Sequence, residues 1–253
     1  MRARGTAFAS DFDGTLCQSN WITREEYFDP AVLDAIKRYQ EAGGLFGVCT
    51  GRPLLGVTQS VKGILDLDFY IVTTGAQVLD RNCKPIFERV INIDVAQQIY
   101  ERYVADDMFF LAATDDGLIN VGRTLVQGMP IVASLGEIED RVLGVSLECH
   151  ENEQLARRTC EDLNRVFGDL VDGFQNLGSV DVVAKGCSKG SGVRVVREAF
   201  GVATVAGAGD SYNDLPLLRA ADVSYTFHES PQEVRDAATC VVANLAEALA
   251  DFV

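Results

Sequence analysis

The sequence predicts an α/β fold in which a doubly wound parallel sheet is interrupted by an inserted α+β block. Short apolar runs alternate with amphipathic helical patterns at both ends of the chain, as in parallel βαβ units. Between about residues 90 and 180 strands and helices follow in a different order, after which the doubly wound pattern resumes. With 253 residues and a hydrophobic content of 47%, the chain can bury one large core or two modest ones.

The first part of the chain alternates strands with helices. Three apolar runs predict buried parallel strands, at residues 6–9, 45–49 and 69–73. Asp29 and Pro30 open the helix between the first two strands, as N-cap and first helical residue. A second helix leads to the third strand, and a hairpin is expected at 78–87. Residues 17–28 lack periodicity and are expected to be irregular.

The middle of the chain is expected to form a separate α+β domain, from residue 85 to residue 184, between core segments 1–84 and 185–253. Its helical patterns lie at 94–104 and 153–167, and its strands at 109–113, 118–121, 145–149 and 180–184.

The last part returns to alternating helices and strands. A helix is expected at 189–200, with strands at 203–206, 223–226 and 240–242. Ser230 and Glu233 predict a capping box, with Pro231 as the first helical residue. Asn244 with Glu247 is expected to cap a terminal helix.

Composition excludes several classes of partner. A net charge of −15 repels nucleic acid and anionic lipid, and no apolar run approaches the roughly 20 residues that span a bilayer. The seven cysteines are scattered without a Cys-x-x-Cys pair, and two histidines support a zinc site poorly. We therefore expect a cytoplasmic protein with reduced thiols, monomeric or a small homo-oligomer, that binds neither nucleic acid nor membrane. The net charge does not exclude a small phosphorylated metabolite as its partner, provided that a few local cations receive it.

The motif on which the rest depends follows the first strand. Asp11 and Asp13 stand two residues apart, so on an extended backbone both carboxylates should converge on one small volume. Like charges at such a distance need a cation between them or a retained proton. Both solutions suit phosphoryl transfer, in which one carboxylate attacks phosphorus and the other moves a proton. The alternative is an ordinary acidic turn whose carboxylates are merely solvated.

Further polar clusters follow two more strands and open one helix. They are Thr50, Gly51 and Arg52; Asp210, Asn213 and Asp214; and Lys189. Because ligands bind at the carboxyl ends of parallel strands, these clusters and the first acidic pair form one coherent phosphate site. Asp210 adds an oxygen ligand for magnesium, Thr50 donates to phosphate, and Lys189 neutralises charge. Taken singly, each has a simpler interpretation, such as Asp214 capping a helix.

With these motifs in view, the chain resembles the haloacid dehalogenase-like (HAD) hydrolase superfamily, and within it the Cof-type phosphatases with a large α/β cap between the second and third motifs. The matching motifs are Asp-Phe-Asp-Gly-Thr-Leu at 11–16, Thr-Gly-Arg at 50–52, Cys-Ser-Lys-Gly at 187–190 and Gly-Asp-Ser-Tyr-Asn-Asp at 209–214. The resemblance covers essentially the whole chain and implies a Rossmann-like HAD core with an inserted cap.

The resemblance also implies the catalytic and metal-binding roles. Asp11 would be the nucleophile and Asp13 the general acid and base. Mg²⁺ would be held by the Asp11 side chain, the Asp13 backbone carbonyl and the Asp210 side chain. Asp214 would support this set. The second aspartate of the first motif favours phosphatase chemistry over dehalogenation.

Phosphate binding is implied for Thr50 with Gly51 and for Lys189. Asn213 would help to orient Lys189 and the phosphate, and Arg52 is a candidate substrate contact. Relatives often carry Asn-Gly-Ala where this chain has Thr-Gly-Ala at 74–76, so substrate contacts at that rim are expected to differ.

The function expected from the sequence is a magnesium-dependent phosphomonoester hydrolase of small metabolites, sugar phosphates above all, working through an aspartyl-phosphate. Two alternatives stay open at this point. One is a phosphomutase or phosphotransferase that uses the same intermediate, and the other is a non-catalytic sensor of a phosphorylated ligand.

Overall fold

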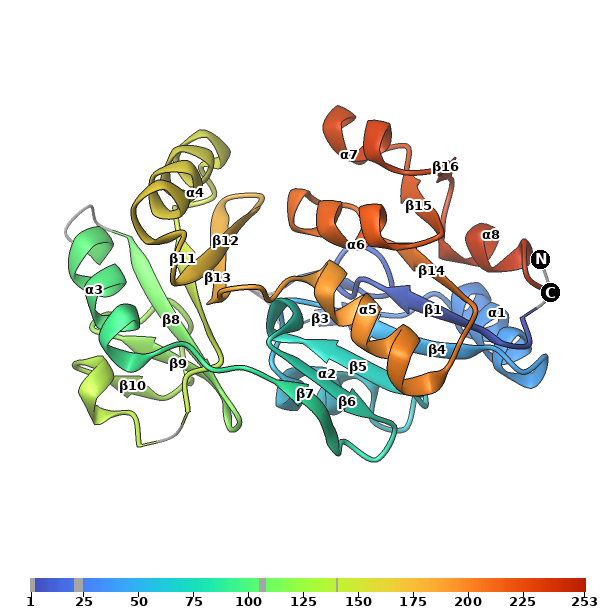
Figure 1. Cartoon of the computed structure of the whole chain (residues 1–253), viewed down its shortest axis with the longest axis horizontal. Helices are drawn as coiled ribbons and strands as arrows, with labels where there is room; N and C mark the ends of the chain where they lie inside the picture. Colours follow the sequence, from blue (N-terminus) through green and yellow to red (C-terminus); the bar gives the residue numbers. More distant parts are fainter. Residues whose placement is uncertain (1–2, 21–24, 105–107, 140) are drawn as a thin grey trace.

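The computed structural model describes residues 3–20, 25–104, 108–139 and 141–253. These residues form two α/β parts that lie side by side (Figure 1). The larger part, which we call the core, contains both ends of the chain, and the smaller part, the cap, is built from its middle. This arrangement confirms the predicted doubly wound core with an inserted α+β block.

The core is built on an eight-stranded sheet in the order β16-β15-β14-β1-β4-β5-β6-β7. The first six strands in this order run parallel, whereas β6 and β7 are antiparallel additions at one edge. The strands are β1 (Thr6–Ser10), β4 (Leu45–Cys49), β5 (Phe69–Val72), β6 (Gln77–Asp80), β7 (Pro85–Glu88), β14 (Thr204–Ala208), β15 (Val223–Phe227) and β16 (Cys240–Val242). Because β7 belongs to this sheet, the predicted start of the inserted block at residue 85 is wrong: it cuts off the second strand of a hairpin.

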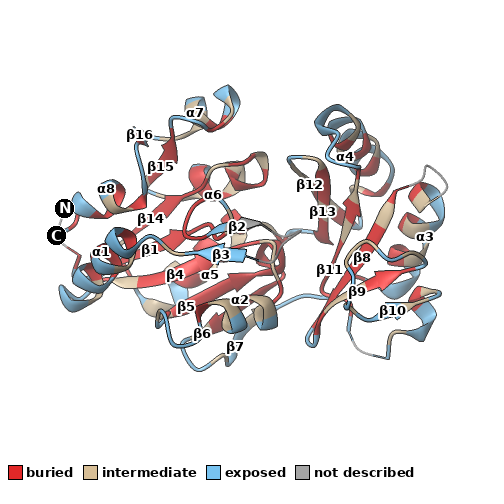
Figure 2. Ribbon diagram, turned by 180° about the vertical axis from the view of Figure 1, so that it is seen from behind, coloured by how far each residue is buried: buried red, intermediate tan, exposed pale blue. Residues whose placement is uncertain are grey.

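Helices cover both faces of the core sheet, which is why its strands read as continuous apolar runs (Figure 2). On β1, Ala7 and Ala9 pack toward one side, while Phe8 stacks between Phe46 and Tyr225 on the other. One face carries α1 (Pro30–Glu41), α2 (Leu54–Val61) and α8 (Leu245–Ala250), and the other carries α5 (Lys189–Phe200) and α6 (Leu215–Ala220), with α7 (Gln232–Ala237) beside α6.

The cap is a six-stranded sheet in the order β10-β9-β8-β11-β13-β12, antiparallel except for the β9–β10 pair. Its strands are β8 (Phe109–Thr114), β9 (Gly117–Val121), β10 (Ile131–Val132), β11 (Gly144–Glu148), β12 (Val171–Asn176) and β13 (Ser179–Ala184). Helices α3 (Ile93–Tyr103) and α4 (Glu153–Phe167) cover the outer side of this sheet (Figure 1). Two strands of the cap were not predicted from the sequence. They are β10, which is only two residues long, and β12, whose Val-Asp-Gly-Phe-Gln-Asn pattern is only half apolar.

Two local expectations were wrong. The stretch expected to be irregular at 17–28 forms a hairpin of β2 (Gln18–Asn20) and β3 (Glu25–Tyr27), although 21–24 lie outside the described residues. Ser230 does not cap α7: its hydroxyl bonds Thr226 and the backbone of Phe227, and the helix begins one residue after Pro231. The Asn244 cap of α8 is confirmed, because its side-chain oxygen accepts from Glu247 N at 3.0 Å.

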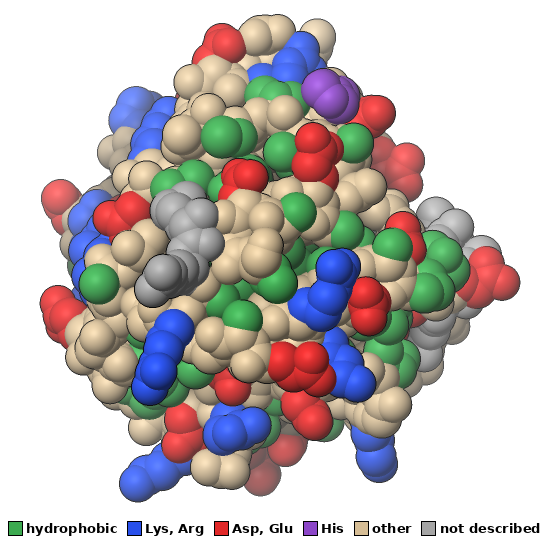
Figure 3. Space-filling view, turned by 90° about the vertical axis from the view of Figure 1, so that its right-hand side faces the viewer, with side chains coloured by type: hydrophobic (Ala, Val, Ile, Leu, Met, Phe, Trp, Pro, Cys, Tyr) green, Lys and Arg blue, Asp and Glu red, His purple; other side chains and the backbone are tan. Residues whose placement is uncertain are grey.

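All seven cysteines are free thiols. In the part of the chain that the structure describes, no helix has the length and apolar character that crossing a membrane requires. On the face shown in Figure 3, Lys and Arg side chains are interspersed with Asp and Glu and do not gather into one basic patch.

Candidate active site

The site forms where three neighbouring strands, β14, β1 and β4, end at the same edge of the core sheet. The backbone N–H of Asp11 donates to Ala208 O at 2.8 Å, which fixes the turn after β1 against the end of β14. Gly14 has a φ of +81°, and a Cβ at this position would lie 2.7 Å from Asp210 Oδ2. A glycine is therefore required for the first motif to approach Asp210 this closely.

A buried lysine joins the first and last motifs. Lys189, the first residue of α5, is 1% exposed, and its Nζ lies 2.7 Å from Asp11 Oδ1 and 2.6 Å from Asp214 Oδ1. Burial alone lowers the pKa of this amine, but Asp11 and Asp214 raise it more, to well above the usual range. Lys189 is thus a permanent cation between two carboxylates.

Three carboxylates share a small volume around this lysine. Oxygens of Asp11, Asp210 and Asp214 all lie within 4.8 Å of one another. Burial and then the charge of Asp214 raise the pKa of Asp11 well above its usual range, against the opposing pull of Lys189. Burial and Asp214 likewise raise the pKa of Asp210 to about 6. One lysine cannot balance three carboxylates, so this oxygen donor set fits a hard divalent cation such as Mg²⁺.

The contacts of Asp214 show that it organises this cluster. Its Oδ1 accepts from Lys189, and its Oδ2 accepts from the backbone N–H groups of Asp210 and Ser211 at 2.9 and 3.0 Å. Asp214 thereby holds the lysine and the turn that carries Asp210, and it leaves Asp11 and Asp210 as the carboxylates best placed for a cation.

Asp13 is not part of the group formed by the oxygens of Asp11, Asp210 and Asp214, contrary to the expectation that its carboxylate would converge with that of Asp11. The chain leaves the extended conformation after Ser10, so the two-residue alternation of a strand no longer applies. The Asp13 carboxylate is instead clamped by Arg52, whose Nη2 and Nε lie 2.6 and 2.8 Å from its two oxygens. The side chain of Asp13 is 44% exposed, so it stands at the open side of the cluster.

Arg52, the candidate substrate contact, has its guanidinium committed within the protein. Besides the Asp13 clamp, its Nη1 donates to Glu26 Oε1 at 2.7 Å and to Ser60 Oγ at 3.0 Å. The guanidinium carbon lies 4.5 Å from the centre of the Phe12 ring. Arg52 thus connects the β2–β3 hairpin to Asp13.

The predicted phosphate-binding residues meet a carboxylate from the cap. Thr50 is 1% exposed, and its Oγ1 accepts from Arg52 N at 3.1 Å. A Cβ on Gly51 would lie 3.0 Å from Asp181 Oδ2, on cap strand β13. That same oxygen accepts from Asn213 Nδ2 at 3.1 Å and from Thr74 Oγ1 at 3.2 Å. Asp181 therefore brings the cap into contact with the core loops that were predicted to bind phosphate.

Asp181 was not among the site residues predicted from the sequence. The signal was a single acid in the apolar strand Val-Asp-Val-Val at 180–183, immediately before the Lys189 motif. A charged residue in such a strand is rarely buried without a partner.

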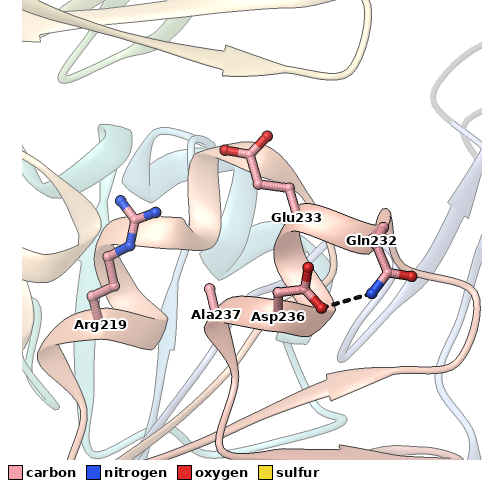
Figure 4. Close-up of a pocket in the computed structure, with 5 residues that line it drawn as sticks. All are labelled: Arg219, Gln232, Glu233, Asp236 and Ala237. Carbon is pink, nitrogen blue, oxygen red and sulfur yellow. Dashed lines mark hydrogen bonds between the residues drawn. The ribbon is translucent and has the colours of Figure 1, made fainter.

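A separate hollow lies on the core surface between α6 and α7. It is lined by Arg219, Gln232, Glu233, Asp236 and Ala237, with Gln232 donating to Asp236 at 2.6 Å (Figure 4). These side chains include none of the motif residues, so this hollow is distinct from the carboxylate cluster.

Comparison with known proteins shows the family to which the chain is similar. A family model described as haloacid dehalogenase-like hydrolase matches residues 8–252. A pyridoxal phosphate phosphatase of Escherichia coli is 25% identical over 97% of this chain and 96% of its own length. A 5-amino-6-(5-phospho-D-ribitylamino)uracil phosphatase of the same organism is 21% identical over 91% of this chain and 88% of its own.

Solved structures show the same fold. A HAD subclass IIB sugar phosphatase superimposes with a TM-score of 0.80 at 18% identity, covering 96% of this chain and 95% of that one. A haloacid dehalogenase-like hydrolase from Bacillus subtilis gives a TM-score of 0.83 at 15% identity, covering 96% of both chains. The chain therefore belongs to the haloacid dehalogenase-like hydrolases, as its motifs predicted, and its fold is that of the capped Cof-type phosphatases of this family.

Proposed function

We propose that this protein is a magnesium-dependent phosphomonoester hydrolase of small metabolites, sugar phosphates above all, and that it works through an aspartyl-phosphate on Asp11. The observation that carries the proposal is the buried Asp11–Lys189 pair, set beside a surplus of carboxylates at the ends of three neighbouring strands. The phosphatases to which the chain is similar act on pyridoxal phosphate, a phosphoribitylamino-uracil and a sugar, by their names.

In the first step, an Asp11 carboxylate oxygen attacks phosphorus, and the bond between phosphorus and the leaving-group oxygen breaks. Lys189 favours this step because it lowers the pKa of Asp11 and so supports the ionised nucleophile. Asp13 gives a proton to the leaving oxygen. In the second step, Asp13 takes a proton from water, whose oxygen attacks phosphorus and releases Asp11 and inorganic phosphate.

The Arg52 clamp gives Asp13 a defined orientation for both proton transfers. A bidentate arginine holds a carboxylate in one plane, and Glu26 and Ser60 hold the arginine in turn. Because Asp13 is partly exposed, its carboxyl group can reach both the leaving group and water.

Asp11, Asp210 and the backbone carbonyl of Asp13 would hold Mg²⁺, with Asp214 supporting them from the Lys189 side. When bound, the ion would supply positive charge that offsets the repulsion among the carboxylates and screens the phosphate. Thr50, Gly51, Lys189 and Asn213 would receive the phosphate oxygens.

The direct test measures phosphate release from sugar phosphates, nucleotides and p-nitrophenyl phosphate, with Mg²⁺ or with EDTA. Asp11→Asn is the matched variant, because it keeps the size of the nucleophile and removes its charge. We expect release by the wild type that requires Mg²⁺ and falls at least about 10³-fold in the variant. If a folded wild type releases phosphate from none of these compounds, the hydrolase proposal is wrong.

A further inference from the structure

Strand β11 of the cap places two polar side chains on the side of the sheet that faces the core. Val145 and Leu147 pack with the apolar cluster under α3 and α4, on the outer side. Successive residues of a strand point to opposite faces, so Ser146 and Glu148 lie on the other side. In the sequence, Glu148 had no assigned role, and none of the chemistry proposed above uses it.

The inner side of the cap sheet is the side that contacts the phosphate-binding loops. Ser146 is the cross-strand partner of Asp181, and Asp181 bonds Thr74 and Asn213 of the core. Glu148 is therefore a diagonal neighbour of Asp181 on the same face, a separation of about 7–8 Å.

The groups that shift the pKa of the Glu148 carboxyl include no basic side chain. Ser146 Oγ donates to its Oε1 at 2.7 Å. Burial, with a smaller contribution from the charge of Asp181, raises the pKa of Glu148 to about 7 against the opposing effect of the Ser146 hydroxyl. No lysine or arginine is among the groups that set this pKa. The guanidinium carbon of Arg123 lies 5.1 Å from the centre of the ring of Phe109, the cross-strand partner of Glu148. A partly buried carboxyl group in such surroundings favours a neutral or cationic hydrogen-bond donor and repels an anion.

Aromatic side chains flank this carboxyl group on the inner face. Phe109 is the cross-strand partner of Glu148 on β8, and Phe174 is the partner of Asp181 on β12. Both rings are only partly buried in this structure. Apolar walls with a few placed polar groups are typical of sites that bind small organic molecules.

We propose that Glu148 is a specificity-determining residue for the leaving group: it accepts hydrogen bonds from hydroxyl or amine groups and excludes leaving groups that carry a second anion. This inference rests on the proposed phosphatase function and names its substrate class more narrowly. The class is monophosphates of neutral or amino polyols, as opposed to bisphosphates and phosphorylated acids.

The test compares three hexose derivatives that share a 6-phosphate and differ in their remaining functional groups. They are glucose 6-phosphate, glucosamine 6-phosphate and 6-phosphogluconate, which are neutral, cationic and anionic apart from the phosphate. The measured quantity is kcat/KM for each, in the wild type, Glu148→Gln and Glu148→Lys. Glu161→Gln is the matched control, because Glu161 is exposed on α4, on the outer side of the cap.

We expect the wild type to prefer glucose 6-phosphate over 6-phosphogluconate by about tenfold or more. Glu148→Gln should lower the ratio of kcat/KM for glucose 6-phosphate to kcat/KM for 6-phosphogluconate at least threefold. Glu148→Lys should lower this ratio further or reverse the preference, and Glu161→Gln should leave the ratio unchanged. If circular dichroism shows that Glu148→Lys does not fold, the kcat/KM ratio of Glu148→Gln alone tests the role of Glu148.

An unchanged ratio in Glu148→Gln, or a wild type that favours 6-phosphogluconate, would overturn the role of Glu148. Hydrolysis of p-nitrophenyl phosphate separates this failure from that of the broader proposal. If p-nitrophenyl phosphate is hydrolysed and the ratio does not respond, the hydrolase function stands and the specificity assignment falls. If nothing is hydrolysed, both fall.

Discussion

Replacing Asp210 with asparagine should make the metal-free protein more stable, although it removes a residue placed in the metal site. The pKa of Asp210 is raised from 3.8 to about 6, chiefly by burial and then by Asp214. A difference of about two pH units corresponds to about 3 kcal/mol that the ionised group costs the folded state at neutral pH. Asparagine keeps an oxygen for the Thr15 hydroxyl, now 3.2 Å from Asp210 Oδ1. We therefore expect the free energy of unfolding of metal-free Asp210→Asn to exceed that of the wild type by about 1–3 kcal/mol.

The stability that Asp210→Asn gains over the wild type must depend on pH in a defined direction. Since the folded state binds this proton more tightly than the unfolded chain, the Asp210 contribution to stability is favourable below about pH 4 and is lost as pH rises through about 6. The advantage of Asp210→Asn over the wild type should accordingly be full above pH 6 and vanish near pH 4.

Urea denaturation in EDTA, followed by circular dichroism from pH 4 to 8, measures this effect. Asp222→Asn is the control with the opposite sign, because Asp222 accepts from Val205 N and pairs with Arg197, each at 2.7 Å. Asp222→Asn should lower the free energy of unfolding by about 0.5–1.5 kcal/mol. Mg²⁺ at a hundred times its Kd should add about 2.7 kcal/mol to the wild type and less to Asp210→Asn. A less stable Asp210→Asn in EDTA at pH 7.5 would refute the reasoning.

Three further variants follow from the same geometry. Lys189→Met should lose about 3–5 kcal/mol in EDTA at pH 7.5, measured by urea denaturation, because two buried carboxylates lose the cation that both contact. Thr74→Asn should raise stability by about 1 kcal/mol in the same assay, since Thr74 has a φ of +50°, which asparagine tolerates better, and asparagine keeps a donor for Asp181. Arg52→Ala should lower kcat for p-nitrophenyl phosphate about tenfold or more, because Asp13 loses its clamp; an unchanged kcat would show that the clamp has no part in proton transfer.

The parallel core could be predicted because its signals are local. Helices α4 and α5 begin and end where the apolar spacing and the caps at Asn152 and Ser188 place them. The strands that carry the motifs are buried on both faces, so they stand out as short apolar runs between polar turns. In such cases local propensity and tertiary environment agree.

Other elements depend on contacts that the local sequence does not specify. The hairpin expected at 78–87 is confirmed by β6 and β7, but the place of β7 in the core sheet depends on the edge that β6 offers, and three of its four residues are exposed. Ser230 has the spacing of a capping box, yet the hydroxyl of Thr226 and the backbone of Phe227 provide its partners. Tertiary partners decided both cases.

The candidate site shows the same division between residue type and environment. That Asp11, Lys189 and Asp210 would meet followed from their places at the ends of neighbouring parallel strands and at a helix start. The separation of Asp13 from Asp11 could not be predicted, because it depends on Arg52 and on a turn that leaves the extended conformation. Asp181 was beyond prediction for a related reason: the register of β13 against β11 and β12 decides which face it occupies.

The contacts between cap and core explain how one chain can both enclose a substrate and release a product. Arg157 of α4 lies 3.5 Å from Glu233 of α7, and both side chains are more than half exposed. Exposed ion pairs of this kind contribute roughly 0–1 kcal/mol each, so they oppose separation only weakly. Asp181 differs because it is only partly exposed and accepts from both Thr74 and Asn213. Separating the cap must break these bonds at the loops proposed to bind phosphate, so the position of the cap and the arrangement of those loops are energetically coupled.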